Sequence, residues 1–161
     1  MTFSFNDLPV EEAERQLQTC FANHAWAAQV AAGRPYFDLA GLLAAAESAW
    51  PALGPADWLD AFAAHPRIGE SGGHAPEASR REQSGVARAR EKTLAALASE
   101  NRRYEERFGH VFLIAAQGRD ADEILAELRR RMSNDPATEV EEAAREQRKI
   151  TRVRLEGLYR G

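Results

Sequence analysis

Nearly every apolar pattern in this chain repeats at the three- and four-residue spacing of a helix, and this periodicity restricts the fold more than any other feature. The patterns begin after Asp, Asn or Pro and end before Gly or Pro, as helices do. One apolar run, residues 110–116, lacks helical spacing, and no second run could pair with it as a strand. We expect a buried extended segment or a helix start there.

The patterns predict an all-α fold, a single compact domain of about eight helices over residues 1–161. The clearest loop is expected at 68–78, and a break near Ser99 is allowed within the longest helix. Asp38 and Asp57 are expected as N-caps, and Gly109 as a helix end. The expected helices cover residues 9–21, 24–32, 39–50, 57–64, 79–107, 121–132 and 136–159.

Composition excludes several classes of function. A net charge of −4 over 161 residues argues against a nucleic-acid partner, because no basic excess exists to neutralise phosphates. No stretch approaches the roughly 18 apolar residues of a membrane span, and the N-terminus lacks signal-peptide features, so we expect a cytoplasmic protein. One cysteine, Cys20, excludes an internal disulfide, and its position beside Leu17 and Phe21 predicts a buried, inert thiol.

His65 is the strongest single candidate for chemistry. The apolar positions Trp58, Leu59, Phe62 and Ala63 lead into it, and Pro66 then stops the helix because it lacks an N–H. A helix C-terminus favours a protonated imidazole, which suits a general acid. The alternative is that His65 only caps its helix.

Polar side chains interrupt the apolar stripe of the last helix. Gln147 and Arg154 lie between Ala143, Ile150 and Leu158 at steps of three or four, so both are expected to face inward. A buried guanidinium is costly unless it meets an anion. That anion is either a structural carboxylate of the protein or an anionic substrate.

The helix start at Ser79 has a similar ambiguity. Gln83 shares a face with Ser79, Val86 and Leu97, and Glu82 lies at its flank. Ser79 to Glu82 also fits a capping box, and free N–H groups at a helix start form an anion site, so the two interpretations overlap.

The remaining motifs are weak. His24 and His74 are expected at the surface, and His110 as a packed or capping residue. The sequence has no metal-ligand cluster and no nucleotide-binding motif, so neither metal nor cofactor is predicted.

The sequence resembles the 2-oxo-4-hydroxy-4-carboxy-5-ureidoimidazoline (OHCU) decarboxylase family of urate breakdown over nearly its whole length. The resemblance rests on the segments Ala64–Gly69, Ser79–Gly85, Asn101–Ala115 and Gly118–Arg119. It continues at Leu125, Leu128, Arg131, Asn134, Glu139, Glu146, Gln147, Ile150, Arg154 and Leu155. It implies a compact all-helical enzyme of purine catabolism that makes (S)-allantoin and CO2 without cofactor or metal. The sequence leaves the oligomeric state open, and the resemblance allows a homodimer.

The resemblance also implies roles for individual residues. It implies that His65 is the proton donor and that Glu82 is a second catalytic residue. The substrate contacts that it implies are Pro66, Ser79, Arg80, Arg81, Glu82, Gln83, Ile114, Ala115, Ala116, Gln117, Gly118 and Arg154. Several of these positions are the ones that the apolar stripes had marked as unusual for a core.

Two other classes of function remain open at the level of sequence. A cofactor-free hydrolase or isomerase on a related ureide could use the same His65 and Glu82, and would release no CO2. A helical binding module would use His65 and Ser79 only as caps and Arg154 in an internal salt bridge. The surroundings of Arg154 distinguish this module from an enzyme.

Overall fold

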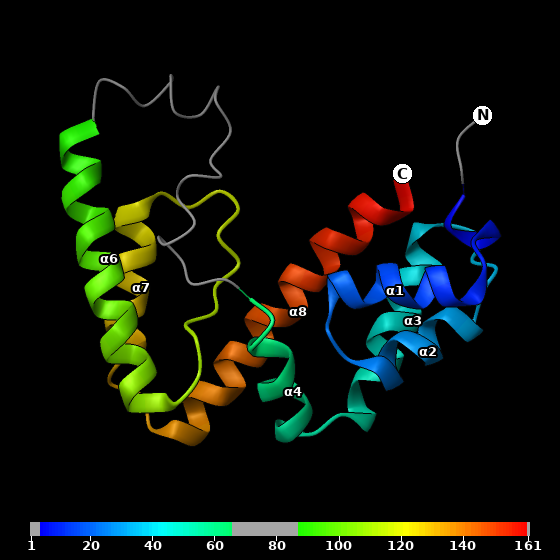
Figure 1. The fold of residues 1–161 in the computed structure, drawn as a ribbon, viewed down its shortest axis with the longest axis horizontal. Helices are drawn as coiled ribbons and strands as arrows, with labels where there is room; N and C mark the ends of the chain where they lie inside the picture. Colours follow the sequence, from blue (N-terminus) through cyan, green and yellow to red (C-terminus); the bar gives the residue numbers. More distant parts are fainter. Residues whose placement is uncertain (1–3, 66–86, 161) are drawn as a thin grey trace. The chain divides into compact units, whose positions relative to one another are not determined.

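The structure, a computed structural model, describes residues 4–65 and 87–160. These residues form seven α-helices and two short 3₁₀-helices and contain no strand, which confirms the all-α class (Figure 1). The chain divides into two compact units, Met1–Ala64 with Ala144–Gly161, and His65–Ala143. Each unit has a hydrophobic core of its own, and the single domain stays a prediction. The loop expected at 68–78 lies outside the described residues.

The first unit contains α1 (Val10–Cys20), α2 (His24–Ala32), α3 (Leu39–Ala49), α4 (Pro55–Phe62) and the C-terminal part of α8 (Pro136–Arg160). The 3₁₀-helices Phe5–Asp7 and Trp50–Ala52 belong to it as well. Its core forms where the buried faces of these helices meet, around Leu17, Phe21, Trp26, Leu42 and Leu155. Burial of aromatic and aliphatic side chains is the main favourable contribution to such a core.

Capping residues define the helix boundaries of this unit. The Asp38 side chain accepts a 2.8 Å hydrogen bond from the Gly41 N–H and begins α3, as the sequence predicts. Asn23 does the same for α2 through the Trp26 N–H, also at 2.8 Å. These side chains satisfy amide groups that a helix start otherwise leaves without an intrahelical partner.

Helix α4 differs from its prediction at both ends. It begins at Pro55, so Asp57 is not the N-cap but lies within the first turn, where its carboxylate accepts from the Gly54 N–H at 3.0 Å. It ends at Phe62, before His65, because the last turn tightens and the Ala64 N–H bonds to the Ala61 carbonyl. Only Ala61 and Phe62 are fully buried, whereas Leu59 and Ala63, expected on the apolar face, are exposed.

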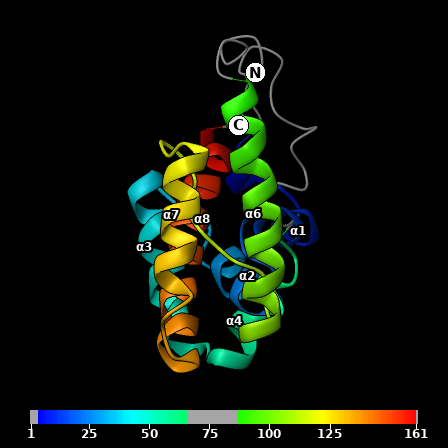
Figure 2. The same cartoon turned by 90° about the vertical axis from the view of Figure 1, so that its left-hand side faces the viewer.

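The second unit contains α6 (Ala87–Phe108), α7 (Ala121–Arg131) and the start of α8. Helices α6 and α7 lie side by side and run in the same direction, and the segment 109–120 returns along them (Figures 1 and 2). Helix α6 has no break at Ser99, and Gly109 ends it with a φ of 80°, a conformation that favours glycine. The core lies around Leu97, Tyr104, Phe112, Leu125 and Leu128.

Replacing the N-cap of α3 tests how helix capping stabilises the first unit. Asp38→Ala removes the acceptor of the Gly41 N–H, so we expect the free energy of unfolding to fall by about 1 kcal/mol in urea denaturation. Asp60→Ala is the matched control, because Asp60 is an exposed residue inside α4 and alanine favours helices. An equal loss in both variants would contradict the capping role.

Candidate active site

The predicted site residues fall into two groups. The structure describes His65, the segment from Ile114 to Gly118, and Arg154. The other predicted residues, Pro66, Ser79, Arg80, Arg81, Glu82 and Gln83, lie outside the described residues. The capping box and the anion site expected at the helix start therefore stay predictions.

His65 lies just beyond the end of α4 and is half-buried. It belongs to the second unit, which also holds the segment Ile114–Gly118. The expected position at the last turn of the helix is thus corrected by a few residues. The role of His65 as a proton donor stays a prediction.

The segment after Gly109 is non-helical, as one of the two sequence expectations had it. Phe112, Leu113 and Ile114 are buried, and the chain reaches the surface from Ala116 onward. A turn closes the segment, with a φ of 81° at Gly118 and a 3.0 Å hydrogen bond from the Arg119 N–H to the Ala116 carbonyl. Buried side chains thus hold one end of this segment while its other end faces solvent.

A buried ion pair anchors this segment at Leu113, immediately before Ile114. Arg131 of α7 is 1% exposed and Glu139 of α8 is 0% exposed. The Arg131 Nε donates to Glu139 Oε2 at 2.8 Å, Nη2 donates to the same oxygen at 2.5 Å, and Nη1 donates to the Leu113 carbonyl at 2.7 Å. The guanidinium also lies over the Phe112 ring, 4.5 Å from its centroid. One arginine thus joins two helices to the segment that precedes Ile114.

Further side chains complete the hydrogen bonding of Glu139. The Tyr104 hydroxyl donates to Oε2 from α6, and the Asn134 amide donates to Oε1 at 3.1 Å. Burial, reinforced by the adjacent Glu139 carboxylate, raises the pKa of Tyr104, so its phenol stays protonated and acts as a donor. A buried carboxylate with this many donors is compensated for the hydration that it loses.

Apolar periodicity in the sequence also marks this pair. The buried residues of α7 are Ile124, Leu125, Leu128 and Arg131, at the same three- and four-residue steps. Glu139 likewise precedes the buried Ala143 and Gln147 by four-residue steps. Both residues also belong to the positions that carry the family resemblance.

The expectation for the last helix is half right. Gln147 is fully buried, as predicted, and donates to Thr151 Oγ1 at 2.9 Å. Arg154 is exposed, so its expected inward orientation is wrong. Its Nη1 donates to the Thr19 carbonyl at 3.2 Å, because the end of α1 offers carbonyls without intrahelical partners. It thus bonds to main chain instead of to the internal carboxylate of the binding-module hypothesis.

The remaining candidates are the other histidines and Cys20. His24 is exposed, as predicted, and His74 lies outside the described residues. His110 is buried against Tyr104 and Phe108, with Nδ1 at 3.0 Å from the Val111 carbonyl, which agrees with a packed histidine. Cys20 is buried, and burial raises the pKa of its thiol to about 11. It is therefore a poor nucleophile at neutral pH.

Three further observations concern the described part of the chain. The first unit has a groove lined by residues that include Trp26, Leu43, Trp50 and Leu155, none of which is a predicted site residue. No group of three or more His, Cys, Asp or Glu side chains in residues 4–65 and 87–160 could hold a metal ion. Among the described helices, none combines the length and apolar character that a membrane span requires.

Known proteins resemble this chain both in sequence and in fold. A family model for OHCU decarboxylase matches residues 6–156. The uric acid degradation bifunctional protein TTL of Arabidopsis thaliana is 30% identical over 158 residues, which cover 94% of this chain and 49% of that protein. The 2-oxo-4-hydroxy-4-carboxy-5-ureidoimidazoline decarboxylase of Amia calva is 41% identical over 58 residues, or 36% of this chain and 33% of that protein. The chain thus spans half or less of these relatives.

Solved structures agree with this fold. A crystal structure of OHCU decarboxylase in the presence of (S)-allantoin has a TM-score of 0.72 and 30% sequence identity, and the match covers 91% of this chain and 98% of that one. A crystal structure of (S)-allantoin synthase has a TM-score of 0.68 at 20% identity, over 96% of this chain and 52% of that one, and supports the fold. The all-α fold is therefore that of a class of carboxy-lyases. The chain belongs to the OHCU decarboxylase family.

The surroundings of Cys20 give a prediction for thiol chemistry. At pH 8 a thiol with a pKa of about 11 is almost entirely protonated, and burial also blocks access. We expect iodoacetamide to modify the native protein at least about tenfold more slowly than the urea-unfolded protein, as measured by intact mass. Equal rates in the two states would show that Cys20 is accessible in the folded chain.

Proposed function

We propose that this chain converts OHCU to (S)-allantoin and CO2, as a step of urate and purine catabolism, without a cofactor. The observation that carries the proposal is the family match across residues 6–156, which includes His65, the segment 114–118 and Arg154. The likeness to an OHCU decarboxylase crystallised with (S)-allantoin supports it. A homodimer stays a prediction.

The substrate supplies much of the chemistry. Its carboxylate and hydroxyl share one ring carbon, and the adjacent ring carbon bears the ureido group. When the bond to the carboxylate breaks, its electron pair enters the ring, so no external electron sink is needed. The hydroxyl-bearing carbon becomes a carbonyl, and the ureido-bearing carbon takes a proton and becomes the stereocentre. Spontaneous protonation occurs on both faces, so the protein must deliver the proton to one face.

His65 is the proposed proton donor. A histidine can hold a proton near neutral pH and deliver it to carbon when it is held at one face of the ring. Glu82 would orient the substrate hydroxyl, and Gln83 and the main chain from Ile114 to Gly118 would bind the ureido and ring carbonyl groups. The exposed surface of residues 116–118 agrees with access of a small molecule to that backbone.

Arg154 is proposed as an anchor for a substrate oxygen. Its exposure leaves the guanidinium accessible, and a carbonyl contact occupies one nitrogen while a guanidinium has five N–H donors. It would not clamp the departing carboxylate alone, because stabilising that charge only in the ground state opposes its loss. Ser79, Arg80, Arg81 and Pro66 complete the proposed contacts.

A coupled assay tests the proposal directly. Urate oxidase and hydroxyisourate hydrolase generate the substrate in place, and circular dichroism follows the product. Optically active allantoin that forms faster than the spontaneous racemic product would support the decarboxylation and the directed protonation together. An unchanged rate and no optical activity would contradict them. Turnover of another ureide without release of CO2 would then favour the hydrolase or isomerase alternative.

Replacing His65 separates chemistry from binding. For His65→Asn we expect kcat to fall by about 10²- to 10⁴-fold, because the proton donor is lost. Thermal unfolding should change little, since His65 lies outside the helices. His24→Asn is the matched control, because His24 is an exposed residue at the start of α2, and its kcat should equal the wild-type value. Wild-type turnover by His65→Asn would refute the assignment.

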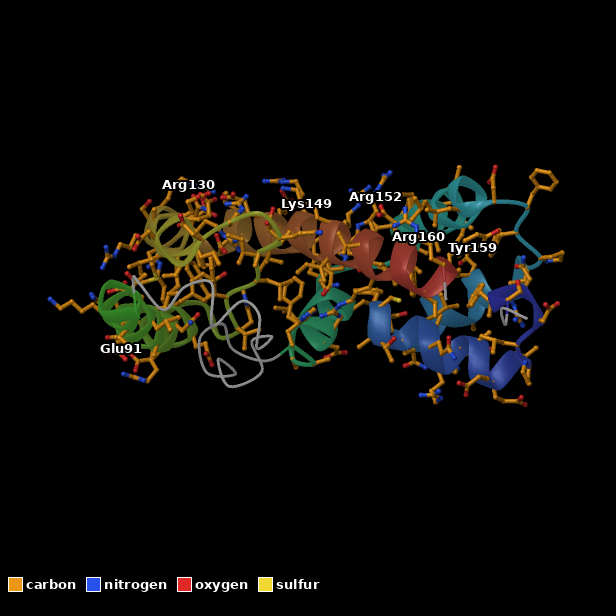
Figure 3. The ribbon with its side chains drawn as sticks, turned by 90° about the horizontal axis from the view of Figure 1, so that it is seen from above. Glu91, Arg130, Lys149, Arg152, Tyr159 and Arg160 are labelled. Carbon is orange, nitrogen blue, oxygen red and sulfur yellow. The ribbon has the colours of Figure 1, made fainter. Side chains whose placement is uncertain are left out.

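Replacing Arg154 tests the anchor. For Arg154→Gln we expect KM to rise by about 10- to 100-fold, the effect of losing a hydrogen bond to a charged group. Arg152→Gln is the control, because Arg152 is exposed on the same helix (Figure 3) and bonds to Glu156. An equal rise in KM in both variants would indicate a general effect of surface charge and would count against Arg154 as a specific anchor.

A further inference from the structure

We infer that Arg131 is a positioning residue that sets the conformation of the proposed substrate-binding segment Ile114–Gly118 through its hydrogen bond to the Leu113 carbonyl. This inference rests on the proposed function for its kinetic consequence, but its structural part can be measured without activity. It assigns to Arg131 a role distinct from that of a group that touches substrate.

The geometry gives Arg131 two separate tasks. Its Nε and Nη2 bond to Glu139, and its Nη1 bonds to the Leu113 carbonyl at 2.7 Å. The first task joins α7 to α8, and the second fixes the peptide group between Leu113 and Ile114. That peptide group is the point at which the proposed binding segment begins.

The Leu113 contact is firmly held because the guanidinium has little freedom to move. It is 1% exposed, it lies over the Phe112 ring, and its two Glu139 contacts fix the plane of the fork. A planar fork with two anchored nitrogens determines where the third nitrogen points. The position of the Leu113 carbonyl is therefore coupled to the ion pair.

The binding segment needs such an anchor because its other end is exposed. Ala116, Gln117 and Gly118 face solvent, and the structure there is a single turn before α7. A backbone that binds a ligand through its own N–H and C=O groups must be held in place, and misplacement by about 1 Å can cost about a hundredfold in rate. The buried residues that precede the turn are where this constraint can act.

Two substitutions separate the two tasks. Arg131→Lys keeps the positive charge near Glu139, but a single ammonium cannot reproduce the fork, so the Leu113 bond is lost. Tyr104→Phe removes a hydrogen bond to Glu139 and leaves the Arg131 to Leu113 contact in place. Both variants weaken the same network, so a purely structural role predicts the same result for both.

The experiment measures backbone order parameters of residues 114–118 by NMR, together with steady-state kinetics well below the Tm of each variant. For Arg131→Lys we expect lower order parameters in this segment and a rise in KM of about tenfold to a hundredfold with a smaller change in kcat. Tyr104→Phe should lower Tm while leaving both readouts at wild-type values. Arg130→Lys is the matched control, because Arg130 is the exposed neighbour that bonds to Glu127 and Glu142 (Figure 3).

A second variant covers the case in which Arg131→Lys does not fold. Arg131→Met combined with Glu139→Gln removes both buried charges together and so avoids an uncompensated ion. It should lower the same order parameters and raise KM in the same way. Wild-type order parameters in both Arg131 variants, or equal changes in Tyr104→Phe, would overturn the inference. A wild-type protein without decarboxylase activity would contradict the proposed function, and the order parameters would still decide the positioning role.

Discussion

The buried pair of Arg131 and Glu139 is the interaction on which the second unit depends. Transferring two charges from water to a protein interior costs several kcal/mol per ion, and the pair is favourable only because Tyr104, Asn134 and the Leu113 carbonyl fill the remaining hydrogen bonds. These partners come from α6, from the turn between α7 and α8, and from the segment 109–120, while the pair itself joins α7 to the start of α8. Loss of one partner would leave a buried group without compensation, so the network favours one arrangement of these elements.

The first unit is organised differently. Its core is a cluster of apolar and aromatic side chains, and its polar contacts include helix caps and bonds to carbonyls at helix ends. The Arg154 contact with the Thr19 carbonyl belongs to this kind. Such contacts tolerate substitution better than a buried ion pair, since their groups remain partly hydrated. The first unit thus has a mostly apolar core, whereas the second unit encloses a buried ion pair next to its apolar core.

The helix pattern was predictable to within a few residues. Helix α2 matches its predicted range, and Asp38, Gly109 and Pro136 mark boundaries as expected, because caps and breakers act locally. The α4 boundaries were less predictable, since the choice between Gly54 and Asp57 as the N-cap depends on which hydrogen bonds the backbone forms. Of the proposed site, the sequence suggested His65, the segment 114–118 and Arg154 as candidates, partly through family resemblance.

The sequence by itself determined the all-α class, most of the helix ends and the membership of the family, because these follow from local periodicity, capping chemistry and motif spacing. Only the tertiary structure decided which polar groups are buried. Arg131 and Arg154 both lie at helical steps from apolar residues, yet one is enclosed by Glu139 and Leu113 and the other is exposed beside Thr19. Burial depends on which elements pack against a helix face, and that is a property of distant residues in the chain.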